Sequence, residues 1–485
     1  IDMRIVFLLL LLAIPVFAAP LPALNPEKPL EETRLLREPE GELQLLELPD
    51  VLVMVEERHP KLLGANLVRG IASAKVLEKQ GAFDPSLGVA STYQRYNSSS
   101  SPGKPLDYIS NGIIVAKQDP SGIKGEGGWL NTQGFPKSPA SSSGDVGEFF
   151  LQAKVPFLRG AGINDKSIAL EQARLVEEQT LEDYQAIRLL TLLDAGMAYL
   201  EWNASVMQWR ILDENQELAI ERAKQVAARI EAGDLAAIDQ VEADREIFKR
   251  RELTLKATRE VQKAALKLAL YLWNSDGQGA GVPQPAQAPL QLPPVQRFTT
   301  EDVYELQLTA LSERPELRQL KLEKSIVELD KDLAENDRLP QLDLTLRPGY
   351  DAGGNGVGFT VKAGVELVIP LATRGPDGRR QAALLKLDKL NLEQVEMIRR
   401  ILIQVQDAAS EAEGAAQRLE QAIALYQKSK ELEEAERTKF QFGDSTLFLV
   451  NSRERATLEA ALKVLTIRLE HSEALILLEA VTGQI

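Results

Sequence analysis

The stretch QLDLTLRPGYDAGGNGVGFTVKAGVELVIPLATRG, residues 341–375, decides the fold of this protein. Apolar and polar residues alternate over residues 341–348, and after a glycine-rich turn they alternate again over residues 357–369. Successive side chains of a β-strand point to opposite faces of its sheet. The stretch therefore predicts a hairpin with one apolar and one polar face, in a chain whose other segments are predicted to be mostly helical.

A second pair of strands is predicted in the first half of the chain. Residues 147–157 alternate in the same way, except that Phe150 lies on the polar face, and residues 87–96 form a weaker strand. The intervening residues 97–146 are rich in serine, glycine and proline, which is typical of a long surface loop. The sequence thus predicts four strands.

The two halves follow one plan. Pro85 lies 25 positions after Pro60, and Pro340 lies 25 positions after Pro315; each pair brackets a helical segment that leads into a strand. Each second strand is followed by a very long helix, a Gly-Asp turn and a further helix. Repeat 1 is predicted at residues 51–276, with long helix 162–231, tip 232–236 and helix 237–272. A Pro/Gly-rich linker follows at residues 277–300. Repeat 2 is predicted at residues 301–485, with long helix 377–440, tip 441–447 and helix 448–481.

The long helices have a coiled-coil pattern. Small and apolar residues recur at alternating spacings of three and four, as in the run from Ala408 to Tyr426. A helix of about 70 residues spans roughly 100 Å, which predicts long antiparallel helical hairpins rather than a globule.

The first residues suggest export. Arg4 precedes the apolar run VFLLLLLAIPVF, and Ala18 follows it, which predicts a signal peptide at residues 1–18 and an extended segment at residues 19–50. No later run is long and apolar enough for a transmembrane helix.

Composition excludes several functions. The net charge of -15 argues against nucleic-acid binding. With no cysteine and two histidines, the sequence predicts no metal site and no disulfide. It contains no nucleophile elbow, phosphate loop or metal-ligand spacing, so neither an enzyme nor a cofactor is expected.

An exported chain with amphipathic strands and no helical anchor suggests a membrane β-barrel. A soluble sandwich or a hairpin packed on helices is the alternative. Four strands cannot close a barrel, so several copies must share one. The side chains expected to face the lumen are Gln152, Lys154, Thr360, Lys362 and Glu366.

The duplicated plan, the HP and RP helix starts, the VP and IP strand ends and the two glycine turns resemble the TolC-like outer membrane efflux proteins, the outer membrane factor family. The resemblance covers nearly the whole chain after the signal peptide. It implies a homotrimer in the cell outer membrane, with a shared 12-stranded barrel in lipid and an α-helical tunnel across the periplasm. Such a channel conducts exported substrates passively from an inner membrane transporter and a periplasmic adaptor protein. The cargo, whether drug, metal or polypeptide, stays open.

The resemblance also implies roles for residues at the helical turns. The adaptor-docking tips correspond to Gly233, Asp234, Leu235, Gly443, Asp444 and Ser445. The entrance constriction corresponds to Asp239, Glu242, Phe440, Leu449 and Ser452. Asp239 matches the family's acidic pattern, whereas Leu449 and Ser452 replace the acidic residues of the second half, and Phe440 lacks a hydroxyl. An apolar constriction near residues 447–450 is the substitute hypothesis, and Asp239 with Glu242 could equally be a solvated helix face.

Two other classes compete with a channel. A coiled-coil envelope spacer or adhesin would have no pore, but it would not need hairpins with a polar second face. An envelope enzyme would need a catalytic motif that the sequence lacks.

Overall fold

The computed structural model describes residues 44–485 except 99–101, 139–141, 290 and 354–357. The predicted signal peptide and most of the predicted extended segment lie outside the described residues. Helix α1 begins at Leu48, so the end of that segment is helical. Within the described residues, no helix is both long and apolar enough to cross a membrane.

The chain divides into two compact units, each assembled from several segments. One, here called the tip unit, combines the described residues up to Pro60 with those of Thr191–Gln296 and Glu413–Glu473. The other, the sheet unit, combines Lys61–Leu190, Arg297–Ala412 and Ala474–Ile485.

In each half of the chain, two α-helices precede the strands and two α-helices follow them. Their bounds are α1 Leu48–Arg58, α2 Pro60–Gln80, η1 Gly81–Phe83, α3 Asp165–Glu231, α4 Ala237–Ala269, η3 Pro285–Gln287, α5 Thr300–Glu313, α6 Pro315–Asn336, α7 Arg374–Gln441 and α8 Leu447–Thr482. Proline begins α2 and α6, where its missing N–H costs no helical hydrogen bond.

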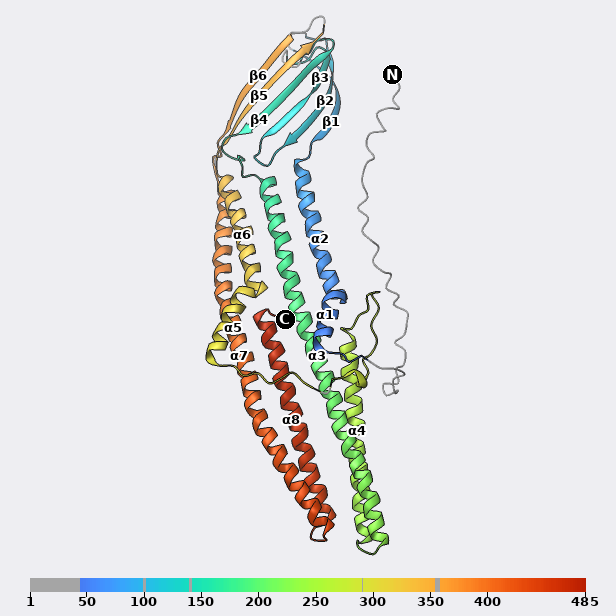
Figure 1. Ribbon diagram of the computed structural model, residues 1–485. Coiled ribbons are helices and arrows are strands. Elements are labelled where there is room, and N and C mark those ends of the chain that lie inside the picture. Colours follow the sequence, from blue (N-terminus) through green and yellow to red (C-terminus); the bar gives the residue numbers. More distant parts are fainter. Residues whose placement is uncertain (1–43, 99–101, 139–141, 290, 354–357) are drawn as a thin grey trace. The chain divides into compact units, whose positions relative to one another are not determined.

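The sheet unit contains one sheet of six strands, drawn side by side in Figure 1. The strands are β1 Ser86–Tyr96, β2 Leu106–Gln118, β3 Lys124–Gly134, β4 Gly147–Pro156, β5 Gln341–Ala352 and β6 Gly358–Val368. They pair in sequence order, and every neighbouring pair is antiparallel. Strands β1 and β6 are therefore the two edges.

The prediction of four strands is wrong, because residues 97–146 contain the hairpin of β2 and β3 rather than only a loop. Glycine normally signals a turn, and β3 has four glycines. Here glycine serves close packing: a Cβ on Gly128 would lie 2.4 Å from the carbonyl oxygen of Ile113, and one on Gly127 would lie 2.9 Å from the Leu151 side chain. Glycine in a strand interior often marks such an approach.

Small apolar residues form the helical cores. In the sheet unit, Ala310 of α5 packs with Ile401, Val405 and Ala408 of α7 and Leu478 of α8. In the tip unit, Ala223 and Val226 of α3 pack with Ala243 of α4 and Leu447 of α8. Small side chains let helix backbones approach closely and pack in the coiled-coil manner.

Candidate functional site: an amphipathic sheet and two helical tips

One face of the sheet is apolar and uncovered. Its side chains are 39 to 74% exposed, and no helix or second sheet of the described chain lies over them. The strand registers place the following residues on this face: Leu87, Val89, Tyr93, Ile109, Ile113, Val115, Phe149, Leu151, Leu344, Leu346, Tyr350, Phe359, Val361, Val365 and Leu367. An apolar surface of this extent marks a site of interaction with lipid or protein.

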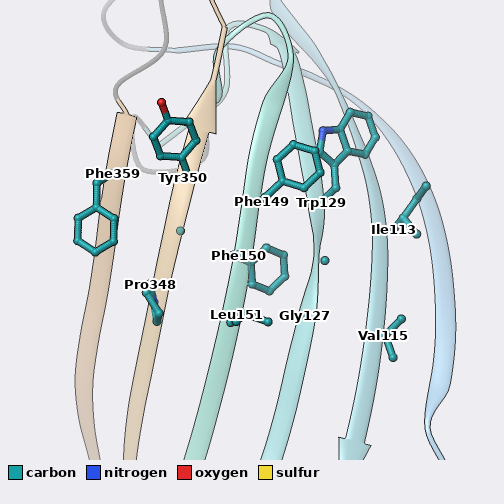
Figure 2. Close-up of a pocket in the computed structure, with 12 residues that line it drawn as sticks. Ile113, Val115, Gly127, Trp129, Phe149, Phe150, Leu151, Pro348, Tyr350 and Phe359 are labelled. Atoms are coloured by element: carbon teal, nitrogen blue, oxygen red, sulfur yellow. The ribbon is translucent and has the colours of Figure 1, made fainter.

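An aromatic row crosses this apolar face. Trp129, Phe149, Tyr350 and Phe359 are directly opposite one another on four neighbouring strands, β3 to β6 (Figure 2). The Trp129 indole N–H donates to the carbonyl oxygen of Val146 at 2.7 Å, so its one polar group is satisfied. Aromatic rows are typical of the levels at which a barrel meets the surface of a membrane. The sequence analysis missed Trp129, since it assigned this residue to a loop.

A hollow of about 820 Å³ lies beside the aromatic row. Val115 and Leu151 flank Gly127, whose missing side chain leaves the floor open (Figure 2). The lining is almost entirely apolar, so the hollow is a part of the same apolar surface and not a polar binding site.

The opposite face of the sheet carries a network of charged and polar side chains. The Lys154 ammonium lies 2.8 Å from Asp343 and 2.9 Å from Glu366. The Gln152 amide donates to Glu126 at 3.2 Å, and the Thr360 hydroxyl donates to Glu148 at 2.6 Å. Lys362 is opposite Arg347 on the same face. All five residues expected to face a lumen thus share this face, with Glu126 as a member from the unpredicted β3.

The neighbours of Phe150 explain how an aromatic ring is accommodated on the polar face. The Arg347 guanidinium lies over its ring, 3.8 Å from the centroid, and the ring is 5% exposed. Gly128 and Gly349 are the residues opposite Phe150 on the two neighbouring strands, so neither competes with it for space. The Glu148 carboxylate holds the other side of Arg347 at 3.0 Å. A cation over an aromatic face is a favourable electrostatic contact.

The two predicted tips are two identical turns. Gly233 and Gly443 both have φ of 84°, which glycine adopts without the strain of a Cβ. The N–H of Gly233 donates to Ile230 and that of Asp234 to Arg229; Gly443 and Asp444 make the two corresponding bonds. This is the Schellman arrangement, which satisfies carbonyl groups that a helix end leaves unpaired.

The acidic residues beyond the first tip have partners within the chain. The Asp239 carboxylate accepts from the backbone N–H of Ala236 at 3.2 Å, so it closes the first turn of α4. Glu242 pairs with Arg245 at 2.8 Å on the same helix. At the second tip, the Ser445 hydroxyl donates to Glu436 at 2.6 Å.

The apolar residues at the tips divide into a buried and an exposed set. Leu235 and Phe440 pack with Leu447, and the Arg229 guanidinium lies 5.1 Å from the centre of the Phe440 ring. Phe440 is thus a packing residue inside the chain. Leu449 is 43% exposed, and Ser452, one turn further on α8, is exposed as well.

The apolar constriction expected at residues 447–450 therefore has fewer outward-facing residues than predicted. Leu447 and Val450 are each 1% exposed, which leaves Phe448 and Leu449 as the two apolar side chains that face outward.

A buried charge cluster joins the two helical hairpins of the tip unit. Glu454 of α8 is 2% exposed and accepts from Arg250 of α4 at 2.7 Å and from Arg437 of α7 at 2.8 Å. It also pairs with Arg222 of α3. Glu246 of α4 lies 3.3 Å from Arg250. Four helices therefore share one carboxylate. This cluster is not predicted from the sequence, because its members have the pattern of ordinary surface charges on long helices.

The cluster keeps Glu454 ionised. Burial by itself raises the pKa of a carboxyl group, because it penalises the charged form. Attraction from Arg222 and Arg250, together with their hydrogen bonds, outweighs burial and lowers the pKa of Glu454 below its ordinary value. A carboxylate that stays charged at 2% exposure holds its arginine partners in place.

This chain is similar to known proteins in its fold but not in its sequence. No protein-family model matches the sequence, and no curated protein matches it. Among solved structures, the outer-membrane channel OprN is similar with a TM-score of 0.64 at 15% identity, over 90% of this chain and 90% of OprN. VceC from Vibrio cholerae has a TM-score of 0.62 at 15% identity, over 90% of this chain and 96% of VceC.

A third similar structure is that of the open state of the Neisseria gonorrhoeae MtrE outer membrane channel. Its TM-score is 0.63 at 15% identity, over 90% of this chain and 88% of MtrE. The fold of this chain is thus similar to theirs over most of each chain. The chain has the fold of these outer-membrane channels.

Proposed function

We propose that this chain forms a homo-oligomeric channel in the cell outer membrane, extending into the periplasm. The channel conducts exported substrates passively, and the chain itself catalyses no reaction. The observation that carries the proposal is a sheet with an uncovered apolar face, crossed by an aromatic row, and an opposite face that carries a network of charged and polar side chains. The likeness to solved outer-membrane channels supports it.

The two faces of the sheet suit lipid and water. On the apolar face, exposed leucine, valine and phenylalanine side chains match the hydrocarbon of outer membrane lipid. On the polar face, Lys154, Arg347 and Glu148 form ion pairs that tolerate a water-filled lumen. A soluble sandwich would need a second layer over the apolar face, and the described chain supplies none.

Free edges call for further copies of the chain. Strands β1 and β6 each have eleven residues and no proline, so both can form a full ladder with another strand. In lipid an unpaired edge is not tolerated, so the sheet must close. An even number of strands per copy makes β1 of one copy antiparallel to β6 of the next. Three copies would give eighteen strands, in place of the twelve expected for four strands per copy.

An eighteen-stranded barrel is wide. Barrels of about 16 to 18 strands enclose an aqueous channel, whereas barrels of about eight are filled by their own side chains. We therefore assign the β2–β3 hairpin the role of widening the barrel of a homotrimer.

The tips suit the docking of a partner protein. Gly233–Leu235 and Gly443–Ser445 are hydrogen-bonded turns with exposed Gly-Asp pairs, which suits docking of a periplasmic adaptor that connects to an inner membrane transporter. Phe448 and Leu449 line an apolar constriction at the entrance, which can gate by excluding water. The substitution Leu449→Asp should then raise the leak conductance, and Ser452→Asp should raise it less.

The test is the conductance of the purified, detergent-extracted chain in a planar lipid bilayer, with the mass of the same preparation determined in parallel. Conducting particles with the mass of three chains would support the trimeric channel. Deleting residues 106–134 should leave conducting trimers of lower conductance, since six strands would be lost from the barrel. A soluble monomer, or trimers that never conduct even with Leu449→Asp, would overturn the proposal in favour of an envelope spacer.

A further inference from the structure

Two rows of exposed apolar side chains lie near the tips. One row, the α4 seam, consists of Ile238, Val241, Phe248 and Leu255. The other, the α7 seam, consists of Leu425 and Leu432 of α7 and of Phe442, which directly follows the end of α7. All seven side chains are exposed within the chain, with Phe248 at 69% and Phe442 at 79%. Single exposed apolar residues are ordinary, whereas two rows at regular spacing suggest a partner.

The partners of α4 and α7 within the chain lie on other sides of these helices. The buried positions of α4 include Ala243, Glu246 and Arg250, and no buried position of this helix belongs to the α4 seam. On α7, Arg437 reaches the buried Glu454, and it too lies outside the α7 seam. The two seams are thus left over after each helix has packed within its own chain.

The spacings of the two seams match. Along α4, Ile238, Phe248 and Leu255 are separated by ten and then seven residues. Against the chain direction along α7, Phe442, Leu432 and Leu425 are also separated by ten and then seven residues. Helix α4 leads away from one tip and α7 leads toward the other, so the two seams fit in an antiparallel arrangement. Each spans about 26 Å and begins within a few residues of its tip glycine.

The residues between these apolar pairs also match. In this register Glu252 is opposite Lys428, two opposite charges, and Arg245 is opposite the small Ala435. Val241 is opposite Lys439, whose long aliphatic stem can cover an apolar neighbour. Both helices then show the alternating spacing of three and four, as a coiled-coil seam requires.

We propose that the α4 seam of one copy packs against the α7 seam of a neighbouring copy, with Ile238 opposite Phe442, Phe248 opposite Leu432 and Leu255 opposite Leu425. This inference rests on the proposed homo-oligomeric channel and names the surface that joins its helical ends. The two seams are different surfaces of one chain, so the contact is head to tail. Such contacts form a closed ring when the rotation between copies closes.

Paired cysteines test the register. The chain has no cysteine, so every thiol is an introduced one. The full-length double variant Phe248→Cys/Leu432→Cys, in detergent, should give covalent dimers and trimers with copper-catalysed oxidation or a short bismaleimide. The matched control Phe248→Cys/Leu425→Cys is displaced by one heptad, about 10 Å, and should give few cross-links. Phe248→Cys and Leu432→Cys alone should give no cross-linked trimer.

The outcomes separate this inference from the proposed function. Conducting trimers in which the matched pair cross-links no better than the displaced pair would overturn the seam and leave the channel standing. A cross-link confined within one chain, seen as a monomer of altered mobility, would also overturn it. A preparation that is monomeric and never conducts would overturn the channel itself.

A charge exchange gives a second test that keeps the apolar residues intact. Glu252→Lys places two positive charges opposite each other and should lower the temperature at which the oligomer dissociates. Adding Lys428→Glu to the same chain should restore that temperature, because the opposite charges then face each other in exchanged positions. The loss of the exposed pair of Lys428 with Glu431 is a small effect by comparison. Failure of the second change to rescue the first would overturn the register.

Discussion

Charged side chains on the sheet and in the helical hairpins differ in their exposure to water. On the polar face of the sheet, Lys154 bridges Asp343 and Glu366, and the Glu366 side chain stays 57% exposed. In the tip unit, Glu454 is 2% exposed and shared by three arginines. Water screens the pair of Lys154 with Glu366, so this pair contributes little to stability. Glu454 and Arg250 are almost fully buried, so both depend on their charged partners for solvation.

The exposed charges of the sheet thus keep a surface hydrated, whereas the cluster around Glu454 holds helices together. At an exposed sheet position such as Glu366, the charge can be replaced by another polar group without loss of the fold. In the cluster around Glu454, the removal of this carboxylate takes a counter-charge from three arginines at once, although Arg250 keeps Glu246 and Arg437 keeps Glu433. The following predictions test this contrast.

Replacement of the shared carboxylate should have the largest effect on stability. Glu454→Gln leaves three arginines without their common counter-charge and should destabilise the fold by about 3 kcal/mol or more. The measurement is chemical denaturation followed by helical circular dichroism. Glu242→Gln, which removes an exposed helix-surface pair, should cost less than about 1 kcal/mol. Equal losses in the two variants would contradict the contrast.

A charge on the apolar face of the sheet comes next. Leu151→Lys introduces an ammonium group into the surface assigned to lipid and should destabilise the sheet by about 2–4 kcal/mol in a membrane. Thr360→Lys, on the polar face, should be nearly neutral. The comparison is the denaturation midpoint of both variants folded into lipid bilayers. A Leu151→Lys variant as stable as Thr360→Lys would mean that this face does not contact hydrocarbon.

Acid should weaken the helical hairpins through Glu454. Its pKa is lowered on folding, so it contributes stability above the ordinary carboxyl range and loses that contribution as the pH falls through the lowered pKa. The denaturation midpoint of the native chain should therefore fall between about pH 5 and pH 3. Glu454→Gln should show a shallower fall over this range, since its side chain does not titrate. Identical pH profiles would show that other groups control the acid response.

The tip glycines should show the smallest effect. Gly233→Ala meets no neighbouring atom but must adopt a φ of 84°, which should cost about 1 kcal/mol. Gly414→Ala, in the interior of α7 and equally open, should instead stabilise the helix by about 0.5–1 kcal/mol. The two changes in unfolding free energy should therefore have opposite signs. A neutral Gly233→Ala would imply that the turn is free to rearrange.

Regular patterns in the sequence predicted most of the elements. The alternation in residues 341–348 and 357–369 corresponds to β5 and β6, and the tip glycines coincide with the ends of α3 and α7. These features depend on local rules, namely the two-residue period of a strand and the positive φ of a glycine cap.

The β2–β3 hairpin could not be predicted in the same way. Glycine in β3 was interpreted as a loop signal, whereas the structure uses Gly127 and Gly128 to admit neighbouring groups. The side chain of Leu151 and the carbonyl group of Ile113 occupy that space, and both belong to strands that are distant in sequence from one another. A local pattern contains no information about such neighbours.

The sequence by itself determined the class of the fold, the amphipathic character of β4 to β6 and the positions of the two tips. The tertiary structure decided the number of strands, the aromatic row and the sharing of Glu454 by four helices. The reason is physical. Periodicity and turn chemistry act within one segment, whereas strand pairing and burial of charge depend on which segments meet. These contacts between segments determine the number of strands in the sheet and the stability of the helical hairpins.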